Sequence, residues 1–316
     1  MVIPTRNRAH LLALTLRSVL GQRDVDIEVI VVDDGDGPET AALVNAFDDA
    51  RVRLIRNCKP RGECGARNCG VAAAQRKWVA FCDDDDLWAP EKLSAQLVAA
   101  ADQGAAWVYA GYVAVDLRLR VLSGSPPPSP EEVLRDLDRH NSVPAGASNV
   151  VVKADALAAA GPFDTTLRTS GDWDQWLRLA RTAGRPACVP RPFVALRVHP
   201  GMVSRRADWI LNDIEVVAQR YGIPVDRARH HRWAAWMSLE NNRRGAALKH
   251  YAKAVAAGDW RSIGRAVVAL LDRSIVQRRS LAADEPWARE AQIWLDALNA
   301  PTVPSATFRR SEVADS

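Results

Sequence analysis

The sequence predicts an α/β domain with a mostly parallel mixed sheet flanked by helices, followed by an all-helical C-terminal extension. Strand-like apolar runs alternate with amphipathic helical runs from residue 1 to about residue 115, which is the pattern of an α/β domain. The strand signal ends near residue 205, and helical periodicity then continues to about residue 298. Two predicted strands also end in acidic clusters, where open α/β sheets bind ligands.

The N-terminal elements are the clearest. Val2–Ile3 predicts a short strand ended by Pro4, and Asn7 is placed to cap the helix that follows. The β-branched run at 27–32 predicts a buried parallel strand. The next expected elements are a helix at 39–48, a strand at 52–55, a helix at 66–74, a strand at 78–81, a helix opened by Pro90 and a strand at 107–115.

The middle of the chain is interrupted by a proline-rich segment at 124–130. Because proline cannot continue a helix or a central strand, we expect a loop over the site or an insertion there. Beyond it we expect a strand at 149–152, helices at 155–160 and 172–183, and a last strand at 193–198. We therefore expect an α/β domain at 1–205, a helical domain at 206–300 and a disordered tail at 301–316.

The composition is that of an ordinary globular protein. The 316 residues are 48% hydrophobic and 25% charged, and the net charge of +4 is too small to indicate a nucleic-acid partner. Residues 205–316 carry 18 Lys and Arg against 13 Asp and Glu. This excess predicts either a solvated helical surface or contact with an anionic acceptor or a membrane surface. Six of the eleven tryptophans also lie there, where we expect them to hold helices together.

The cysteines and the lack of a visible secretory leader bear on the cellular compartment that we expect. Five cysteines, Cys58, Cys64, Cys69, Cys82 and Cys188, are an odd number without the spacing of a zinc site. We interpret them as reduced thiols. No secretory leader and no apolar run of membrane-spanning length is visible, so we expect a soluble cytoplasmic protein.

The acidic clusters Asp33–Asp34 and Asp83–Asp86 follow predicted strands and should face one crevice. Four adjacent carboxylates repel one another unless a cation compensates them. Asp83 and Asp85 would point to the same side of an extended segment. Hard oxygen ligands suit Mg²⁺ or Mn²⁺, which can bridge the oxygens of a diphosphate. The run thus predicts a divalent metal site, and a solvated acidic loop is the alternative.

The motifs together resemble those of the family 2 glycosyltransferases, which have a GT-A (Rossmann-like) fold and invert the anomeric centre. The matching segments occur in the family's order and span about residues 1–205. They are Val2 to Arg8, Ile30 to Gly35, Gly65 to Gly70, Phe81 to Trp88, Gly171 to Leu179 and Arg197 to Gly201.

The resemblance implies a role for each matching residue. It places Pro4 and Thr5 against the nucleoside of a nucleotide-sugar donor, with Asp34 on the base and Asp33 as a weaker partner. It assigns Asp83 or Asp84 to the ribose, and Arg67 to holding the donor. Asp85 would bind the metal, and His199 would approach the metal or the diphosphate. Asp172 would be the general base, and Asp86 would fix the loop.

The predicted base has alternatives within its own helix. Asp172 starts a predicted helix, so a helix N-cap is the structural alternative. Asp174 is the competing base, although its place within the helix favours a surface role, and Arg178 fits a structural ion pair. The sequence departs from the family's pattern at Gly171, where an acidic residue is usual, and at Asp36, where serine is common.

The leading prediction is an inverting, metal-dependent glycosyltransferase that uses a UDP-sugar with Mn²⁺ or Mg²⁺. A nucleotidyltransferase of related fold would show a glycine-rich phosphate loop, but Pro4–Arg8 contains no glycine. A catalytically degenerate nucleotide-sugar-binding module is the non-enzymatic alternative. A dehydrogenase is excluded because no G-x-G-x-x-G follows the first strand.

The sequence leaves the acceptor and the helical extension open. Saccharide, lipid-linked, peptide and small-molecule acceptors all fit the family resemblance. The extension, in which 232–257 resembles a helix pair of tetratricopeptide type, would serve homodimerisation, acceptor binding, peripheral membrane contact or support of the α/β domain.

Overall fold

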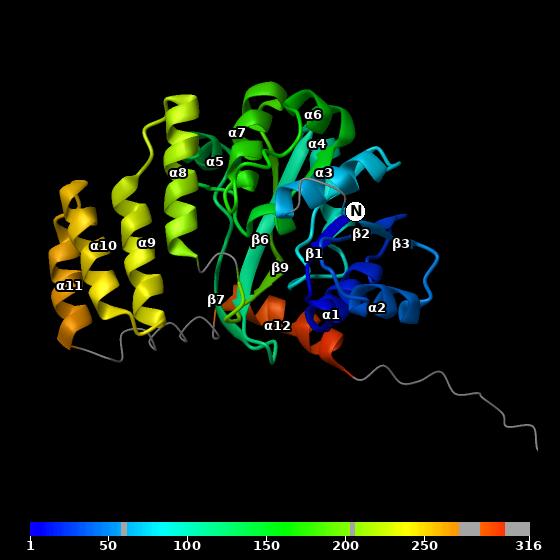
Figure 1. The fold of residues 1–316 in the computed structure, drawn as a ribbon. Helices are drawn as coiled ribbons and strands as arrows, with labels where there is room; N and C mark the ends of the chain where they lie inside the picture. Colours follow the sequence, from blue (N-terminus) through cyan, green and yellow to red (C-terminus); the bar gives the residue numbers. More distant parts are fainter. Residues whose placement is uncertain (58–61, 203–205, 272–284, 301–316) are drawn as a thin grey trace, which may run out of the picture.

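The computed structural model describes residues 1–57, 62–202, 206–271 and 285–300. A curled β-sheet with helices on both sides forms the main body, and further helices stack beside it at one end (Figure 1). The tail predicted at 301–316 lies outside the described residues, as does Cys58. The other four cysteines are free thiols, as expected. No helix in the described ranges is long and apolar enough to cross a membrane.

The N-terminal strands form a parallel three-stranded unit. β1 (Val2–Thr5) pairs with β2 (Val29–Asp33), which pairs with β3 (Val52–Arg56). Alternate residues of β2 face opposite sides, with Ile30 and Val32 in one apolar cluster and Val29 and Val31 in the other. Both faces of this unit are therefore covered by helices, which explains the continuous β-branched run.

The remaining strands form a mixed unit in the order β4-β8-β6-β9-β5, with β7 paired to β6. A parallel bridge between Val2 and Phe81 joins it to β1. Strands β1, β2, β3, β4, β6 and β9 run in one direction, and β5, β7 and β8 run in the other. The sheet is thus mixed, with six of its nine described strands running in one direction and four of its seven strand pairs antiparallel. The bounds are β4 Trp78–Ala80, β5 Asp86–Trp88, β6 Trp107–Val115, β7 Val121–Ser125, β8 Val151–Lys153 and β9 Ala187–Arg197.

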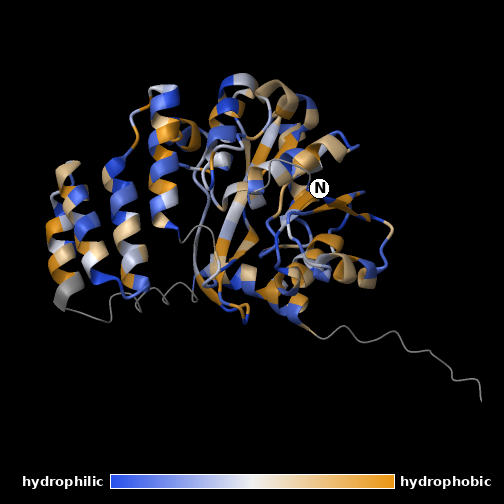
Figure 2. Cartoon of the chain, in the orientation of Figure 1, coloured by the Kyte–Doolittle hydropathy of each residue, from blue (hydrophilic) through white to orange (hydrophobic). Residues whose placement is uncertain are grey.

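The helices flank this sheet and continue into the extension. Those of the α/β part are α1 (Ala9–Leu20), α2 (Glu39–Phe47), α3 (Glu63–Ala73), α4 (Lys92–Asp102), α5 (Pro130–Asp136), the 3₁₀ turn η1 (Gly146–Asn149), α6 (Ala154–Ala160) and α7 (Gly171–Ala183). Those that follow are α8 (Ala207–Tyr221), α9 (Arg227–Glu240), α10 (Arg244–Ala256), α11 (Arg261–Leu271) and α12 (Pro286–Asn299). Apolar residues concentrate on the strands beside the N-terminus, whereas polar and apolar residues alternate along α8 (Figure 2).

Three local predictions are corrected. Asn7 does not cap α1; the N-cap is Arg8, and Asn7 adopts a left-handed φ of 54°. The acidic run leads into strand β5, so the next helix begins at Lys92 and not at Pro90. The segment 124–130, expected as a loop over the site or an insertion, is a loop only at 126–129, because β7 reaches Ser125 and α5 begins at Pro130, and this loop does not line the site. The side chain of Ser129 starts α5 as part of a capping box.

The extension meets the α/β part at both of its ends. Ile214 and Val217 of α8 join the main apolar cluster. At the other end, Trp287 of α12 occupies the space that a β-carbon would take at Gly111, and its indole N–H donates to the Tyr112 carbonyl at 3.1 Å. The expected role of tryptophan as interhelical packing fails at Trp260, which is 72% exposed. Helices α9, α10 and α11 stack outward from this body (Figure 1).

Candidate functional site

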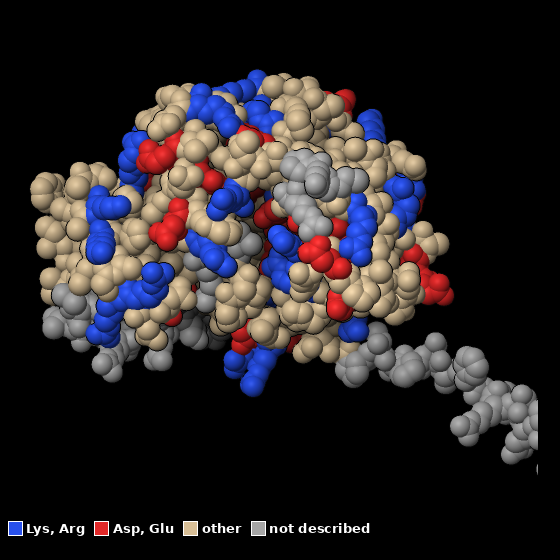
Figure 3. Space-filling view, in the orientation of Figure 1, with Lys and Arg blue, Asp and Glu red and all other residues tan. Residues whose placement is uncertain are grey.

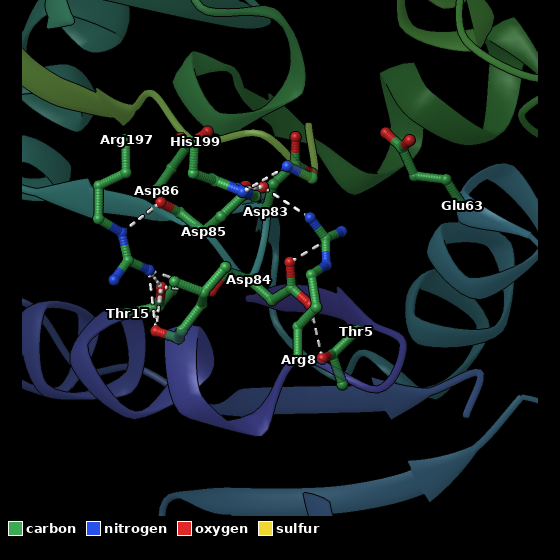
Figure 4. A network of polar contacts seen from close by, with 12 residues as sticks. Thr5, Arg8, Thr15, Glu63, Asp83, Asp84, Asp85, Asp86, Arg197 and His199 are labelled. Atoms are coloured by element: carbon green, nitrogen blue, oxygen red, sulfur yellow. Dashed lines mark hydrogen bonds and ion pairs between the residues drawn. The ribbon is translucent and has the colours of Figure 1, made fainter. Parts of the chain in front are cut away.

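The acidic run occupies the turn between β4 and β5, and its backbone is fixed by buried groups (Figure 4). The Thr15 hydroxyl donates to the Asp84 carbonyl at 2.8 Å. The guanidinium of Arg197, on β9, donates to the carbonyls of both Asp84 and Asp85. The Asp83 N–H donates to Ser148 Oγ at 2.9 Å. Because these contacts hold the backbone of the run, its side-chain carboxylates can point in different directions.

Two of these carboxylates are internal. Asp84 is fully buried, accepts from Thr5 Oγ1 at 2.6 Å and forms an ion pair with Arg8 at 3.0 Å. Burial raises the pKa of Asp84 to about 7, although Arg8 opposes the shift. Asp86 accepts from Ser148 Oγ at 2.5 Å, and burial raises its pKa well above the usual range. Asp86 therefore fixes the loop, in agreement with the prediction.

Asp85 is the carboxylate of the run that lies beside another potential metal ligand, His199. Its Oδ2 lies 3.0 Å from His199 Nε2 and 2.7 Å from Arg8 Nη1. Burial alone would raise the pKa of Asp85, but the His199 hydrogen bond and the charge of Arg8 lower it overall. Because His199 Nδ1 accepts from the Gly201 N–H at 3.2 Å, we assign the ring proton to Nε2, which donates to Asp85.

The pair Asp85 and His199 fits a Mg²⁺ or Mn²⁺ ion in part. No group of three or more His, Cys, Asp or Glu side chains in the described ranges is arranged to hold a metal. Mg²⁺ commonly binds through only one or two carboxylates, with substrate phosphates and water completing its shell. In this structure the Arg8 guanidinium supplies the positive charge beside Asp84 and Asp85. Arg8 and His199 both contact Oδ2 of Asp85, so a metal bound through that oxygen requires Arg8 to move away from it.

A cavity of about 660 Å³ adjoins the run. Predicted residues that line it are Pro4, Thr5, Asp34, Arg67, Asp83, Asp85 and Asp172. Its lining also includes residues to which the sequence motifs gave no role, namely Arg6, Arg8, Glu63, Arg168 and Trp209. The structure thus brings five of the seven predicted donor residues, the predicted metal ligand Asp85 and the predicted base to one space, which we call the donor cavity. The other predicted metal ligand, His199, is outside this lining and contacts Asp85.

Two predicted donor residues lie behind this lining. Asp33 is 1% exposed, and its Oδ1 accepts from the Gly35 N–H at 2.9 Å, which shapes the turn after β2. Asp84 is covered by Thr5 and Arg8, as described above. Asp34 does reach the cavity, where it accepts from Asn57 Nδ2 at 2.7 Å and from the Gly62 N–H at 3.0 Å.

Helix α3 contributes a buried cation to the cavity wall. Arg67 is 2% exposed and forms ion pairs with Glu63, one turn earlier, and with Asp83 at 2.7 Å. Its guanidinium also lies over the Phe163 ring, 5.6 Å from the centroid. The pKa of Glu63 is raised, first by burial and then by Asp83 and Asp172, against the opposing charge of Arg67. The Glu63–Arg67 pair is visible in the sequence as an i, i+4 spacing.

Asp172 stands at the far side of the donor cavity, on the first turn of α7. Its carboxylate accepts from the Trp173 N–H at 2.7 Å and from Asn141 Nδ2 at 2.9 Å. Burial raises its pKa, while the charge of Arg67 opposes the rise. The N-cap of α7 is Ser170, so Asp172 does not hold the capping position that was its structural alternative.

Close packing explains the glycine before the predicted base. A β-carbon at Gly171 would lie 2.2 Å from Cys64 Sγ, so the side chain usual in the family has no room here. A β-carbon at Gly146 would likewise lie 2.7 Å from Asp172 Oδ2. Gly171 thus leaves room for the Cys64 side chain, and Gly146 lets its own backbone approach the base closely.

Asp174 is buried and does not line the donor cavity. It accepts from Arg178 at 2.7 Å, from Arg220 at 2.9 Å and from the Tyr221 hydroxyl at 2.7 Å. It is 1% exposed, so the surface role expected for it is wrong. The predicted structural ion pair of Arg178 is confirmed. Asp174 therefore joins α7 to α8 and is not placed to act on a substrate.

The chain is similar in sequence to known glycosyltransferases. Residues 1–149 match the family model described as Glycosyl transferase family 2. The succinoglycan biosynthesis protein ExoO of Rhizobium meliloti is 41% identical over 104 residues, which are 33% of this chain and 30% of that protein. The Escherichia coli UDP-Glc:alpha-D-GlcNAc-diphosphoundecaprenol beta-1,3-glucosyltransferase WfgD is 31% identical over 112 residues, 35% and 44% of the two chains. The matches thus span less than half the length of either relative.

The fold also matches solved structures. The mannosyltransferase PcManGT of Pyrobaculum calidifontis, solved with GDP-Man and Mn²⁺, superposes with a TM-score of 0.54. The sequence identity is 19%, and the superposition covers 94% of this chain and 84% of that one. The GT-A fold expected from the sequence is therefore confirmed.

Proposed function

We propose, for a chain that belongs to glycosyl transferase family 2 through residues 1–149, that it is an inverting glycosyltransferase acting on a UDP-sugar donor. The observation that carries the proposal is the meeting of Asp85 and Asp172 in the lining of one 660 Å³ cavity. One carboxylate lies beside a histidine and the other has a raised pKa. Metal binding and proton abstraction need such different environments.

The nucleotide end of the donor would lie along the ends of β1 and β2. Pro4 offers an apolar surface there, and Asp34 can accept from the base once it exchanges its contacts with Asn57 and Gly62. Asp83 is about a third exposed and accepts from Arg67, so its remaining oxygen can accept from a ribose hydroxyl. The UDP-Glc named for the Escherichia coli relative supports a uridine donor.

Asp85 and His199 would hold a divalent metal, Mn²⁺ or Mg²⁺, as the Mn²⁺ named with the Pyrobaculum structure supports. Such an ion would neutralise the charge on the departing diphosphate. The chain's own contribution is to fix Asp85. Arg197 holds the Asp85 carbonyl, and His199 orients the carboxylate. Arg8, freed from Asp85, would remain beside the phosphates as a second cation.

Asp172 would be the general base. It would take the proton of an acceptor hydroxyl as that oxygen bonds to the anomeric carbon and the bond to the nucleoside diphosphate breaks, with inversion at that carbon. Burial favours the protonated form of Asp172 and so makes it a stronger base than an exposed aspartate. The acceptor would be a saccharide, as the name of the Escherichia coli relative suggests.

A donor panel and one isosteric variant test the proposal. Full-length chain is incubated with UDP-, GDP- and TDP-sugars and Mn²⁺, and donor binding and donor hydrolysis are measured. We expect UDP-sugars to be preferred and EDTA to abolish turnover. Asp172→Asn should keep donor affinity and lower turnover by about 10²–10⁴-fold, the usual worth of a general base. The Asn141 amide, whose Oδ1 has no partner among the described residues, can rotate to accept from the new amide.

Two outcomes would oppose this assignment. Turnover that persists in EDTA would exclude the metal at Asp85, and turnover that survives in Asp172→Asn would place the base elsewhere. Binding of the donor without turnover under every condition would favour the degenerate binding module. The proposal rests on Asp85 and Asp172 both being present and facing one space.

A further inference from the structure

A second cavity, of about 830 Å³, lies beyond the base. Its walls come from α7 and α8 and from α9 and α11 of the extension, and we call it the outer cavity. Asp172 and Asn141 line both this space and the donor cavity. Asp172 is thus at the junction of the two spaces, which is where an acceptor hydroxyl must reach the base.

The two cavities carry opposite charge. The donor cavity is lined by six acidic residues against four arginines: Asp34, Glu63, Asp83, Asp85, Asp86 and Asp172, with Arg6, Arg8, Arg67 and Arg168. In the outer cavity Asp172 is the single acidic residue among the described lining residues, and three arginines face it. Figure 3 shows basic side chains over the extension and beside the central hollow.

The arginines of the outer cavity are only partly neutralised. Arg232 of α9 and Arg265 of α11 both bind Asp259, at 3.0 and 2.9 Å. The guanidinium of Arg229, also on α9, has no hydrogen-bond or ion-pair partner among the described residues, and only its backbone N–H is used, by Asp226. Asp259 therefore serves two of the three guanidinium groups and Arg229 is not served, so the three arginines exceed Asp259 by two positive charges, or by one when Asp172 is also counted.

Aromatic rings complete the lining. Trp173, Trp233, Trp236 and Tyr251 border the outer cavity. Trp173 follows the base directly, and its ring lies 6.1 Å from that of His230 on α9. His140 and His230 each have a buried Nδ1 without a hydrogen-bond partner in the described ranges. Flat apolar faces suit sugar rings, and unused polar groups suit their hydroxyls.

We propose that the outer cavity binds the acceptor, and that this acceptor is a saccharide carrying a phosphate or diphosphate held by Arg229, Arg232 and Arg265. The inference rests on the proposed function, because it takes Asp172 as the base. An unpaired guanidinium with two partly neutralised neighbours suits an oxyanion that offers several acceptor oxygens, such as a phosphate, better than a single carboxylate. The planar guanidinium fork pairs with phosphate in a bidentate manner.

The difference in charge between the two cavities supports separate binding roles for them. An acidic cavity requires an added cation before it can hold a diphosphate, whereas a cavity with surplus arginine can hold one directly. The volume of about 830 Å³ lies in the range of pockets that enclose a small ligand. A phosphate at the arginines would hold the sugar between α7 and α9, with a hydroxyl directed to Asp172.

A binding titration tests the proposal without requiring turnover. The full-length chain is titrated with glucose, galactose, mannose and N-acetylglucosamine 1-phosphates, and with the methyl glycosides and hexuronic acids of matching ring, by calorimetry and tryptophan fluorescence. We expect at least one 1-phosphate to bind about tenfold more tightly than its neutral glycoside. UDP with Mn²⁺ should not displace it. Equal affinity of phosphate and glycoside, equal affinity of the hexuronic acid, or displacement by UDP with Mn²⁺ would overturn the proposal.

Matched arginine variants locate the phosphate. Arg229→Gln removes a charge that has no structural partner, so it should weaken the 1-phosphate about tenfold and leave the methyl glycoside unchanged. Arg261→Gln, an exposed arginine of α11 outside the lining, is the control and should have no effect. Arg232→Gln tests the pair with Asp259, with its melting temperature measured in parallel. Equal responses of Arg229→Gln and Arg261→Gln would contradict the assignment.

The source of the phosphate and the dependence on the proposed function are separated by two further arms. A geranyl-diphosphate-linked monosaccharide that binds more tightly than the 1-phosphate indicates a lipid-carried acceptor, and equal affinity indicates a soluble sugar phosphate; both support a phosphate site. Donor binding is measured in the same variants. If UDP-sugar binding and hydrolysis are normal but the 1-phosphates bind no better than the glycosides, this inference alone is refuted. If the donor does not bind, the proposed function is refuted.

Discussion

Arg8 is the residue whose replacement tests the metal assignment most directly. Its guanidinium lies 2.7 Å from Asp85 Oδ2 and 3.0 Å from Asp84 Oδ1, with 27% of the side chain exposed. Unit charges 4 Å apart attract by about 4 kcal/mol at an effective dielectric constant of 20. Partial exposure and desolvation reduce the net value, and a hydrogen bond to a charged group contributes about 1.5–3 kcal/mol.

A metal that binds Asp85 through Oδ2, the oxygen that Arg8 and His199 both contact, must break the Arg8 contact with that oxygen. Arg8→Gln removes this competition, and a gain of about 1.4 kcal/mol corresponds to tenfold tighter binding. We therefore expect Mn²⁺ to bind the donor-free Arg8→Gln variant about tenfold more tightly than the parent chain. Without metal, the variant should lose about 1.5–3 kcal/mol of stability because Asp84 and Asp85 lose their counterion, and Mn²⁺ should restore most of it.

Calorimetric Mn²⁺ titration and thermal unfolding with and without Mn²⁺ measure both effects. Arg6→Gln is the matched control, because Arg6 lines the same cavity, is exposed and has the same charge. A long-range electrostatic effect would tighten Mn²⁺ binding equally in the two variants. Equal shifts, or weaker Mn²⁺ binding in Arg8→Gln, would refute the argument that Arg8 and the metal share Asp85.

Three further predictions concern stability. Asp174→Asn should cost about 3–5 kcal/mol because Arg178 would lose its buried counterion; denaturant unfolding measures this, and an unchanged midpoint would exclude the structural role. Gly171→Ala should cost about 1–3 kcal/mol through contact with Cys64, and Cys64→Ala in the same chain should recover it. The pKa of His230 is lowered by burial from 6.5 to about 4. The unfolded state therefore binds more protons between these pH values, so stability should fall as the pH falls from 6.5 to 4, by at most about 3 kcal/mol. His230→Leu should flatten this slope in melts across that range.

Local patterns were sufficient to predict most of the strands, with β5 and β7 as exceptions, and the end of the sheet that carries the site. The β-branched run at 27–32 predicted β2 because both faces of that strand are covered by helices. Acidic residues at the ends of β2 and β4 predicted the donor cavity because neighbouring parallel strands end at one edge. These features depend on residues close together in the sequence.

Long-range contacts were outside the reach of such patterns. Arg8 lies 77 residues from its partner Asp85, and Arg197 lies 112 residues from the same residue. Neither pairing has a periodic signature. Strand β5 was missed because Asp86 is buried within it, and buried aspartate is rare enough that a polar loop was the better prediction. The docking of α12 on the sheet depends on Gly111, whose missing side chain admits Trp287.

The charge arrangement around Asp172 links the base to both substrates. Arg67 lowers its pKa from the donor side, and burial raises it. Donor and metal binding would change the net charge beside Asp83 and Asp85. A phosphate at Arg229 would bring negative charge to the side of Asp172 that faces the outer cavity. A negative charge near Asp172 raises its pKa and so strengthens it as a base. Occupation of the outer cavity would thus favour proton transfer only when an acceptor is in place, which protects the donor from hydrolysis by water. A measured pKa of Asp172 that does not rise when a sugar 1-phosphate binds would rule out this coupling.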